Sequence, residues 1–323
     1  MGRYMIRRTL FMVLVLFAVS LLTFLIFVKL PSTDPALRAA GRHPTPEVLA
    51  TIRHRFGLDQ GIVVQYWKFA QGLIPWPGLF LNEGVYYSWI NSVPVKDEIF
   101  SRLPITATLT IGAAVLWMAM GIPIGILSAV RAGSFADRSA MVFALVGVSA
   151  PTFWLALMLL YFFHFKLHIA PTSGIPPGEA LWTAVLKGRF VLPWFSLAVT
   201  SAAFYSRMVR GNLMETMNED YIRTARSKGL SERKVIYKHG LRNALTPVVT
   251  MFGMDVAFLL GGAIITESVF QLPGIGQYAL GALATADFPV VMGVTVLGAL
   301  FIVVANLLVD VVYAFLDPRV RYT

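Results

Sequence analysis

Residues 9–28 read TLFMVLVLFAVSLLTFLIFV, and this stretch decides the class of fold. It carries no charge and is about 20 residues long, the length that a helix needs to cross about 30 Å of hydrocarbon. Arg3, Arg7 and Arg8 precede it, whereas a cleaved secretory signal has an apolar region of only about 7–15 residues and a small-residue cleavage site. The stretch therefore predicts an uncleaved transmembrane helix with a cytoplasmic N-terminus.

The composition of the whole chain agrees with a membrane protein. Hydrophobic residues make up 57% of the 323 residues, charged residues only 14%, and the mean hydropathy is +0.69. A soluble domain carries about 25% charged residues, so this chain could not cover a water-facing surface. The net charge of +10 is attributed to basic cytoplasmic loops rather than to nucleic-acid binding. The absence of cysteine excludes disulfides, thiolate nucleophiles and zinc–cysteine clusters.

Five more apolar runs are long enough to span a bilayer, at about residues 105–130, 139–165, 190–209, 244–265 and 290–315. We therefore expect an all-α integral membrane protein with six transmembrane helices. The segments proposed as cytoplasmic, 1–8, 131–138, 207–242 and 317–323, hold 16 basic residues in about 59 positions. The remaining segments, 29–104, 166–189 and 266–289, hold 11 in about 124. Because basic residues concentrate on the cytoplasmic side, both termini are predicted to be cytoplasmic.

The first outside segment, residues 29–104, is too long for a simple connection and should be structured. Pro46 and Glu47 indicate a helix start, and Gly57 suits the end of that helix. A second amphipathic segment, residues 62–73, is rich in aromatic residues. Such segments anchor at the membrane–water boundary or contact a partner outside the membrane, and the sequence leaves both possibilities open.

Residues 207–242 form the most polar interruption, with nine basic and four acidic residues and no proline. Thr216 to Glu219 match a capping box, so a helix is expected to begin there. Gly229 fits the position just after that helix, and Ser231 fits the N-cap of a second helix beginning at Glu232. The pattern predicts helix, glycine turn and helix, and its composition alone favours attraction to anionic lipid or plain solvation.

The string DYIRTARSKGLSERKVIYKHGLRNAL, residues 220–245, resembles the EAA loop of ABC importer permeases in its dipeptide/oligopeptide branch. Ala225, Gly229 and Leu241 match the general form of that loop. Further landmarks of the branch follow in the expected order, among them PTFW at 151–154, ITESVF at 265–270, PGIG at 273–276 and LDPR at 316–319. The resemblance covers nearly the whole chain, and residues 75–93 are its least recognisable part.

The resemblance implies the type I ABC importer permease fold and one member of a permease pair, the DppB/OppB-like one. Residues 1–100 would hold the first helix and the outside loop, residues 101–316 the permease core with a coupling helix at about 216–242, and residues 317–323 a cytoplasmic tail. The implied partners are a second homologous permease, two cytoplasmic ATPases, an extracytoplasmic substrate-binding protein and membrane lipid, in a bacterial or archaeal inner membrane. The implied ATPase-coupling residues are Tyr221, Arg223, Thr224, Ala225, Arg226, Lys228, Gly229, Leu230 and Ser231.

The implied function is ATP-driven import of di- and oligopeptides, with nickel, glutathione, opines or oligosaccharides as alternatives because these permeases share most landmarks. The chain holds no Gly-Lys dipeptide and hence no Walker A loop, so ATP and magnesium are expected to bind to the partner ATPases and no cofactor to this chain. His164 and His168 have helical metal-ligand spacing but no nearby carboxylate, and we interpret them as interfacial residues.

Charged residues within the apolar runs are candidates for function. Asp255 is the deepest, and either lines the translocation path or pairs with a neighbouring helix. Glu267 is a second candidate for the path or its gate. An intramembrane enzyme would need paired catalytic residues within spans, and a channel or stand-alone transporter would need no docking helix, so both alternatives fit the sequence less well. The small residues of Gly121-Ile-Pro-Ile-Gly125 are expected to let two helices pack closely.

Overall fold

The computed structural model describes residues 2–29, 34, 36–37, 40, 44–55, 57–71, 87–172 and 174–316. These residues are predominantly helical and contain no extended strand, only one isolated bridge between Tyr87 and Pro94. The chain divides into two compact units, which are described separately. Unit one comprises Met1–Thr106, Ala257–Ile264 and Pro273–Leu307, and unit two comprises Ala107–Val256, Ile265–Leu272 and Leu308–Thr323.

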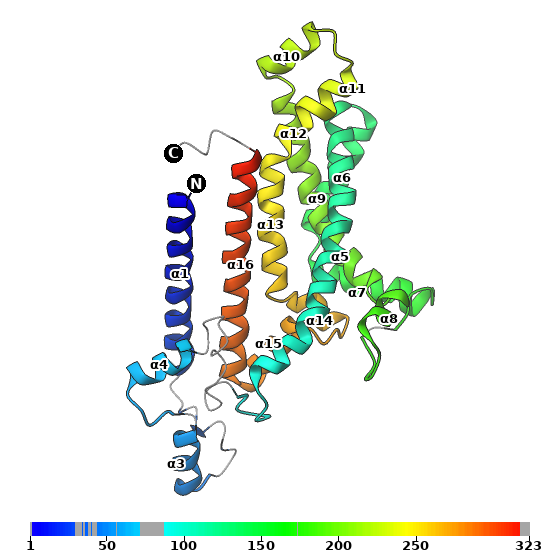
Figure 1. Ribbon diagram of the computed structural model, residues 1–323. Coiled ribbons are helices and arrows are strands. Elements are labelled where there is room, and N and C mark those ends of the chain that lie inside the picture. The colour runs from blue at the N-terminus through cyan, green and yellow to red at the C-terminus, as the bar shows by residue number, and fades with distance from the viewer. Residues whose placement is uncertain are drawn as a thin grey trace. The chain divides into compact units, whose positions relative to one another are not determined.

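The elements follow one another along the chain as labelled in Figure 1. They are α1 (Gly2–Phe24), η1 (Leu25–Lys29), α3 (Pro46–Arg55), α4 (Ile62–Gln71), α5 (Val95–Val130), α6 (Phe135–Ser149), α7 (Thr152–Leu159), η2 (Leu160–Lys166), α8 (Leu181–Leu186), α9 (Val191–Thr216), α10 (Asp220–Ser227), α11 (Glu232–Lys234), η3 (Val235–Gly240), α12 (Leu241–Ala244), α13 (Thr246–Leu260), α14 (Ile264–Val269), α15 (Ile275–Thr285) and α16 (Phe288–Leu316).

Three described helices are long and apolar enough to cross a membrane: α1 with η1, α5 and α16. Two bent helix pairs raise the number to five if each pair counts as one span. The predicted span 190–209 corresponds to α9, which does not pass the same test. Its buried face is made largely of small and polar side chains, including Ser196, Ala202 and Ser206, because it packs against other helices rather than against lipid.

Residues 139–165, which were predicted as one span, do not form a single straight helix. The segment divides into α6 and α7–η2, which meet at an angle of 101°. Pro151 explains the break, because proline disfavours helical geometry in the residue before it. Ala150 accordingly has an extended backbone, with φ −77° and ψ 122°. The predicted span 244–265 is likewise shorter, since α13 ends at Leu260 before two glycines.

Unit one contains the two amphipathic helices predicted after the first span. Helix α3 begins at Pro46 as expected, and Gly57 has the left-handed φ of 65° that suits the end of a helix. Helix α4 packs on α1, where the Tyr66 ring lies 5.5 Å from that of Phe24 and the Tyr66 hydroxyl hydrogen-bonds with Ser20 at 2.9 Å. The aromatic face of α4 is thus used within the chain. Residues 72–86, including the end of the predicted segment, and the tail 317–323 lie outside the described residues.

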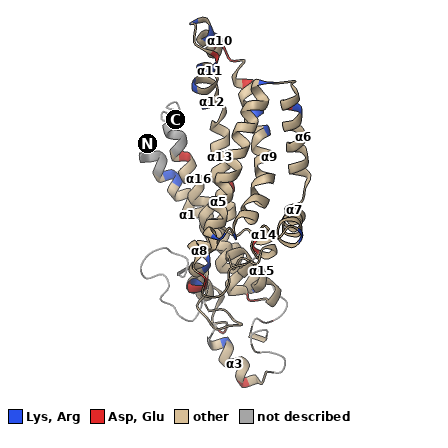
Figure 2. Ribbon diagram, turned by 90° about the vertical axis from the view of Figure 1, so that its right-hand side faces the viewer, with Lys and Arg blue, Asp and Glu red and all other residues tan. Residues whose placement is uncertain are grey.

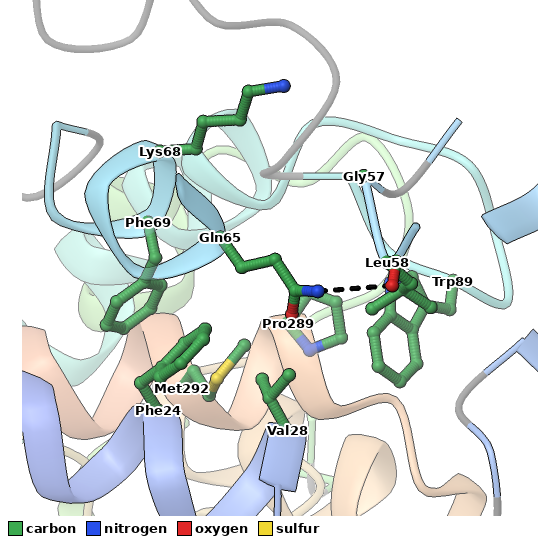
Figure 3. Close-up of a pocket in the computed structure, with 10 residues that line it drawn as sticks. All are labelled: Phe24, Val28, Gly57, Leu58, Gln65, Lys68, Phe69, Trp89, Pro289 and Met292. Atoms are coloured by element: carbon green, nitrogen blue, oxygen red, sulfur yellow. Dashed lines mark hydrogen bonds between the residues drawn. The ribbon is translucent and has the colours of Figure 1, made fainter. Parts of the chain in front are cut away.

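A narrow apolar pocket of about 40 Å³ lies in unit one, between the end of α1, α4 and the start of α16 (Figure 3). The side-chain amide of Gln65 donates to the Leu58 carbonyl oxygen at 3.1 Å and closes one wall. Phe24, Phe69 and Met292 belong to the hydrophobic cluster beside it. The pocket is therefore a gap in a packed apolar layer, and the side chain of Lys68 lies at its rim.

Unit two is built around α9, with α6 lying beside it (Figure 1). The predicted close packing at Gly121 and Gly125 is confirmed: a Cβ at Gly125 would lie 2.7 Å from the Ser206 carbonyl oxygen, and one at Gly121 would lie 3.1 Å from that of Ala202. Gly147 brings α6 equally close to α9. Small residues on three helices thus let the backbones of α5 and α6 approach α9.

Candidate functional site

Residues 217–240, which make up most of the segment between α9 and α13, form what we call the basic hairpin. Helix α9 runs without interruption to Thr216, a turn follows, and α10 begins at Asp220 with Glu219 in the N-cap position. The capping box predicted at Thr216 is therefore wrong. The buried face of α9 continues through Val209 and Leu213, and this tertiary packing outweighs a local start signal at Thr216.

The glycine turn predicted after the first helix is confirmed. Gly229 has φ 75°, and its N–H donates to the Arg226 carbonyl oxygen at 2.9 Å. The next N–H, of Leu230, donates to the Ala225 carbonyl oxygen at 3.4 Å. These two bonds and the contact of Leu230 with Ala225 make a Schellman motif, which satisfies the last carbonyls of α10. Ser231 occupies the N-cap of α11 as expected, and α11 begins at Glu232.

The basic hairpin has a small hydrophobic core of its own. Ile222, Ala225 and Val235 are buried, with Met217 and Leu230 packed against them. On the surface the Arg226 guanidinium pairs with the Glu232 carboxylate at 2.7 Å, which links α10 to α11 across the turn. Exposed pairs of this kind contribute only about 0.2–1 kcal/mol, so the core and the glycine turn hold the hairpin together.

Ala225, which the resemblance includes among the ATPase-coupling residues, lies inside the hairpin rather than on its surface. Ala225 is only 6% exposed and faces Ile222 and Val235 inside the hairpin. The outward face of α10 instead presents long polar side chains, among them Arg223 and Arg226. Exposed members of the predicted coupling set are Tyr221, Arg223, Thr224, Arg226, Lys228, Gly229 and Ser231, while Leu230 is half-buried.

The basic hairpin is fastened to the end of α9. A Cβ at Gly240 would lie 2.9 Å from the Met217 sulfur and 3.3 Å from Leu213 Cδ1, so η3 packs tightly there. The side-chain amide of Asn212 donates to the Ala244 carbonyl oxygen at 3.2 Å. Figure 2 shows Lys and Arg gathered on α10 and α11 and at the adjoining ends of α6 and α9. The arrangement presents a positively charged surface on a base that is packed against the end of α9.

The two candidates for the translocation path lie on different elements. Asp255, on α13, accepts a hydrogen bond from the Tyr205 hydroxyl of α9 at 2.7 Å. Tyr205 is buried and stacks on Trp117 of α5, so Asp255 does pair with a neighbouring helix. Glu267, on α14, is fully buried. Tyr205 was not among the predicted site residues, although its hydroxyl is a polar group within an apolar run and is the signal that marks it.

The two histidines with metal-ligand spacing belong to no metal-binding group among the described residues. Among the described residues no three His, Asp or Glu side chains are grouped so that they could hold a metal ion. The His164 ring contacts the Ala170 carbonyl oxygen at 3.0 Å, and His168 has a left-handed φ of 54°. Both histidines lie at the end of η2, in a turn rather than on one face of a continuing helix.

The chain is the permease subunit of an ABC importer, a membrane component that is not itself an enzyme because ATP hydrolysis belongs to partner subunits. The chain belongs to the family of binding-protein-dependent transport system inner membrane components, whose model matches residues 121–322. The N-terminal model of such components matches residues 1–110. The chain is accordingly an integral inner-membrane protein.

Relatives extend over the full length of the chain. The glutathione transport system permease protein GsiC of Escherichia coli K12 is 37% identical over 323 residues, covering 100% of both chains. A probable peptide ABC transporter permease protein, y4tP of Sinorhizobium fredii, is 35% identical over 325 residues with the same coverage. An inward-facing structure of the MetNI methionine ABC transporter shares the fold with a TM-score of 0.54 at 19% identity, covering 70% of this chain and 99% of that one.

Proposed function

We propose that the chain carries peptides, from dipeptides to short oligopeptides, across the inner membrane to the cytoplasm. The support is the similarity over the whole chain to a peptide permease and to a permease for glutathione, itself a tripeptide. Glutathione alone, nickel, opines or oligosaccharides are the alternatives within the same architecture. The substrate arrives from an extracytoplasmic binding protein and passes between this chain and a second, homologous permease.

The packed structure of the basic hairpin is the main support for the proposed coupling mechanism. Its exposed face, Tyr221 to Ser231, docks in a groove of one of two cytoplasmic ATPases, which bind the ATP and magnesium that this chain does not. A hairpin with its own core, a glycine-closed turn and a tight seat on α9 transmits a displacement with little loss, because it has two packed ends and no flexible tether. Rim cations such as Arg223 and Lys228 would speed docking more than they strengthen it.

The proposed topology has six spans, with both termini and the basic hairpin in the cytoplasm and residues 29–104 and 266–289 outside. It rests on the higher density of basic residues in the segments assigned to the cytoplasm. In this topology α9 crosses the membrane within the bundle, where neighbouring helices cover its polar face. The bent pair of α6 with α7–η2 contributes one crossing.

Asp255 and Glu267 remain our candidates for the translocation path. Asp255 is half-buried and its hydrogen bond with Tyr205 occupies one carboxylate oxygen, which leaves the other for a peptide ammonium group. Glu267 is buried in the present conformation, so it would act only after a rearrangement that exposes it. Both residues would then favour a positively charged amino terminus.

The test is uptake by the complete complex in proteoliposomes, assembled with the second permease, the ATPases and the binding protein of the same transport system. Radiolabelled trialanine, glutathione, Ni²⁺, an opine and an oligosaccharide are supplied outside with ATP enclosed. We expect ATP-dependent accumulation of trialanine, and no ATP binding by the isolated chain. Accumulation of only nickel, opine or oligosaccharide would refute the proposed substrate class, and accumulation of glutathione alone would restrict it.

A further inference from the structure

The Asp137 carboxylate is the centre of a buried polar network in unit two. It lies in the first turn of α6 and is only 5% exposed. Its Oδ1 accepts two hydrogen bonds, one from the Ser128 hydroxyl of α5 and one from Arg210 Nε of α9 at 2.7 Å. The second oxygen accepts from the Gly133 N–H at 2.8 Å and from Arg210 Nη2 at 3.0 Å. One side chain thus joins α5, the turn after it, α6 and α9.

Asp137 and Arg210 form a bidentate ion pair, a geometry that is strong and directional. Arg210 meets the carboxylate with two parallel N–H groups, and both carboxylate oxygens are fully used by four donors. Because Asp137 is buried, loss of one partner leaves a charge that water does not compensate. Lysine in place of Arg210 keeps the charge but presents no planar fork, so it cannot hold two elements in one fixed register.

Helices α5, α6 and α9 are also in close contact at positions outside the network. Gly125 brings α5 onto the backbone of α9 at Ser206, and Gly147 brings α6 to Ala203, where a Cβ would lie 2.7 Å from the Ala203 Cβ. Backbones this close slide past one another only with a clash. Packing therefore fixes the helices laterally, and the Asp137–Arg210 pair fixes their ends.

Helix α9 connects this network to the basic hairpin. Arg210 lies less than two turns before Thr216, where α9 ends and the hairpin begins. Leu213, on the same stretch, touches the hairpin at Gly240, and Asn212 holds the Ala244 carbonyl oxygen. A displacement of the hairpin thus reaches Arg210 through a continuous helix with contacts on both sides.

We propose that Asp137 and Arg210 are positioning residues for energy coupling, which make the ends of α5 and α6 move with α9 when the basic hairpin is displaced. This proposal rests on the proposed function. It concerns the step that follows docking of the basic hairpin on the ATPase, in which movement is passed to α5 and α6. Without the pair, the hairpin still engages the ATPase and ATP is still hydrolysed. The movement of α9 is then absorbed at the turn 131–134 instead of reaching α5 and α6.

The test compares Arg210→Lys and Asp137→Asn with Arg207→Lys, a matched control on the same helix whose side chain is exposed. Uptake and ATP hydrolysis are measured in the same proteoliposomes, and their ratio is used because it does not depend on how much complex is assembled. We expect the ratio to fall about tenfold in both network variants, the effect of losing hydrogen bonds to a charged group, and to be unchanged in Arg207→Lys.

An unchanged ratio in variants that still hydrolyse ATP would overturn the proposal and leave the pair a role in folding only. If neither variant assembles, Ser128→Ala decides, because it removes one donor and leaves the ion pair in place. We expect a smaller fall in its ratio, and an unchanged ratio overturns the proposal. Failure of the wild-type complex to take up any peptide would instead contradict the proposed function.

Discussion

Replacing Gly229 tests the structure of the basic hairpin with little interference from packing. The residue has φ 75°, yet a Cβ there would have no heavy atom within 4 Å. Any cost of a side chain is therefore a cost in backbone conformation. An L-residue in the left-handed region costs about 1–2 kcal/mol, with β-branched residues at the upper end and asparagine well below it. We expect the free energy that holds the hairpin closed to fall by about 1 kcal/mol in Gly229→Ala and by about 2 kcal/mol in Gly229→Val.

The assay is hydrogen–deuterium exchange of the amides of residues 220–235 in the purified complex. Where exchange follows local opening, 1.4 kcal/mol is a factor of ten, so exchange should accelerate about fivefold in the alanine variant and about thirtyfold in the valine variant. Gly211→Ala is the matched control, because Gly211 also has open space around it but does not have a positive φ. Exchange in Gly229→Val no faster than in this control, or faster in Gly229→Asn than in Gly229→Val, would refute the reasoning.

Three further predictions concern topology, packing and pH. A cysteine in place of Glu232, in a chain that has none of its own, should react with an impermeant maleimide only from the cytoplasmic side, and labelling from outside would contradict the topology. Ala225→Glu should melt the hairpin core and so release residues 220–235 to trypsin, whereas intact protection would show that position 225 tolerates exposure. The Lys187 ammonium, and then Arg189, hold the pKa of the Glu179 carboxyl below its ordinary value of 4.5. The folded pKa is the lower one, so this stabilisation is present above about pH 4.5 and is lost as the pH falls further. Limited proteolysis of residues 166–189 should therefore accelerate on acidification in the wild type but not in Glu179→Gln.

The parts of the hairpin that depend on local rules could be predicted from the sequence. A left-handed residue after a helix favours glycine whatever surrounds it, so Gly229 marked the turn and Ser231 marked the next N-cap. The same holds for Pro46 and Gly57 at the two ends of α3. These signals act over three or four residues, within the reach of a single sequence.

What depends on tertiary packing could not be predicted. Thr216 carries a valid start signal, but it is the last residue of α9, because the buried face of that helix continues as far as Leu213. Ala225 is one of the predicted ATPase-coupling residues, but its side chain is buried against Val235 inside the hairpin. The network at Asp137 joins residues 73 positions apart, and no spacing rule connects Asp137 with Arg210. The bend at Pro151 was open to prediction, since a proline in an apolar run indicates a possible break.

The most direct test of the central claim is a cross-link between the outward face of α10 and an ATPase. A photoreactive phenylalanine analogue replaces Thr224, which is exposed on that face, and in a control chain it replaces Thr285, at the end of α15. In membranes containing the assembled complex, we expect the Thr224 variant to form an adduct with an ATPase subunit and the Thr285 variant to form none. Absence of an ATPase adduct at Thr224 in a complex that transports peptide, or an equal adduct at Thr285, would contradict the account.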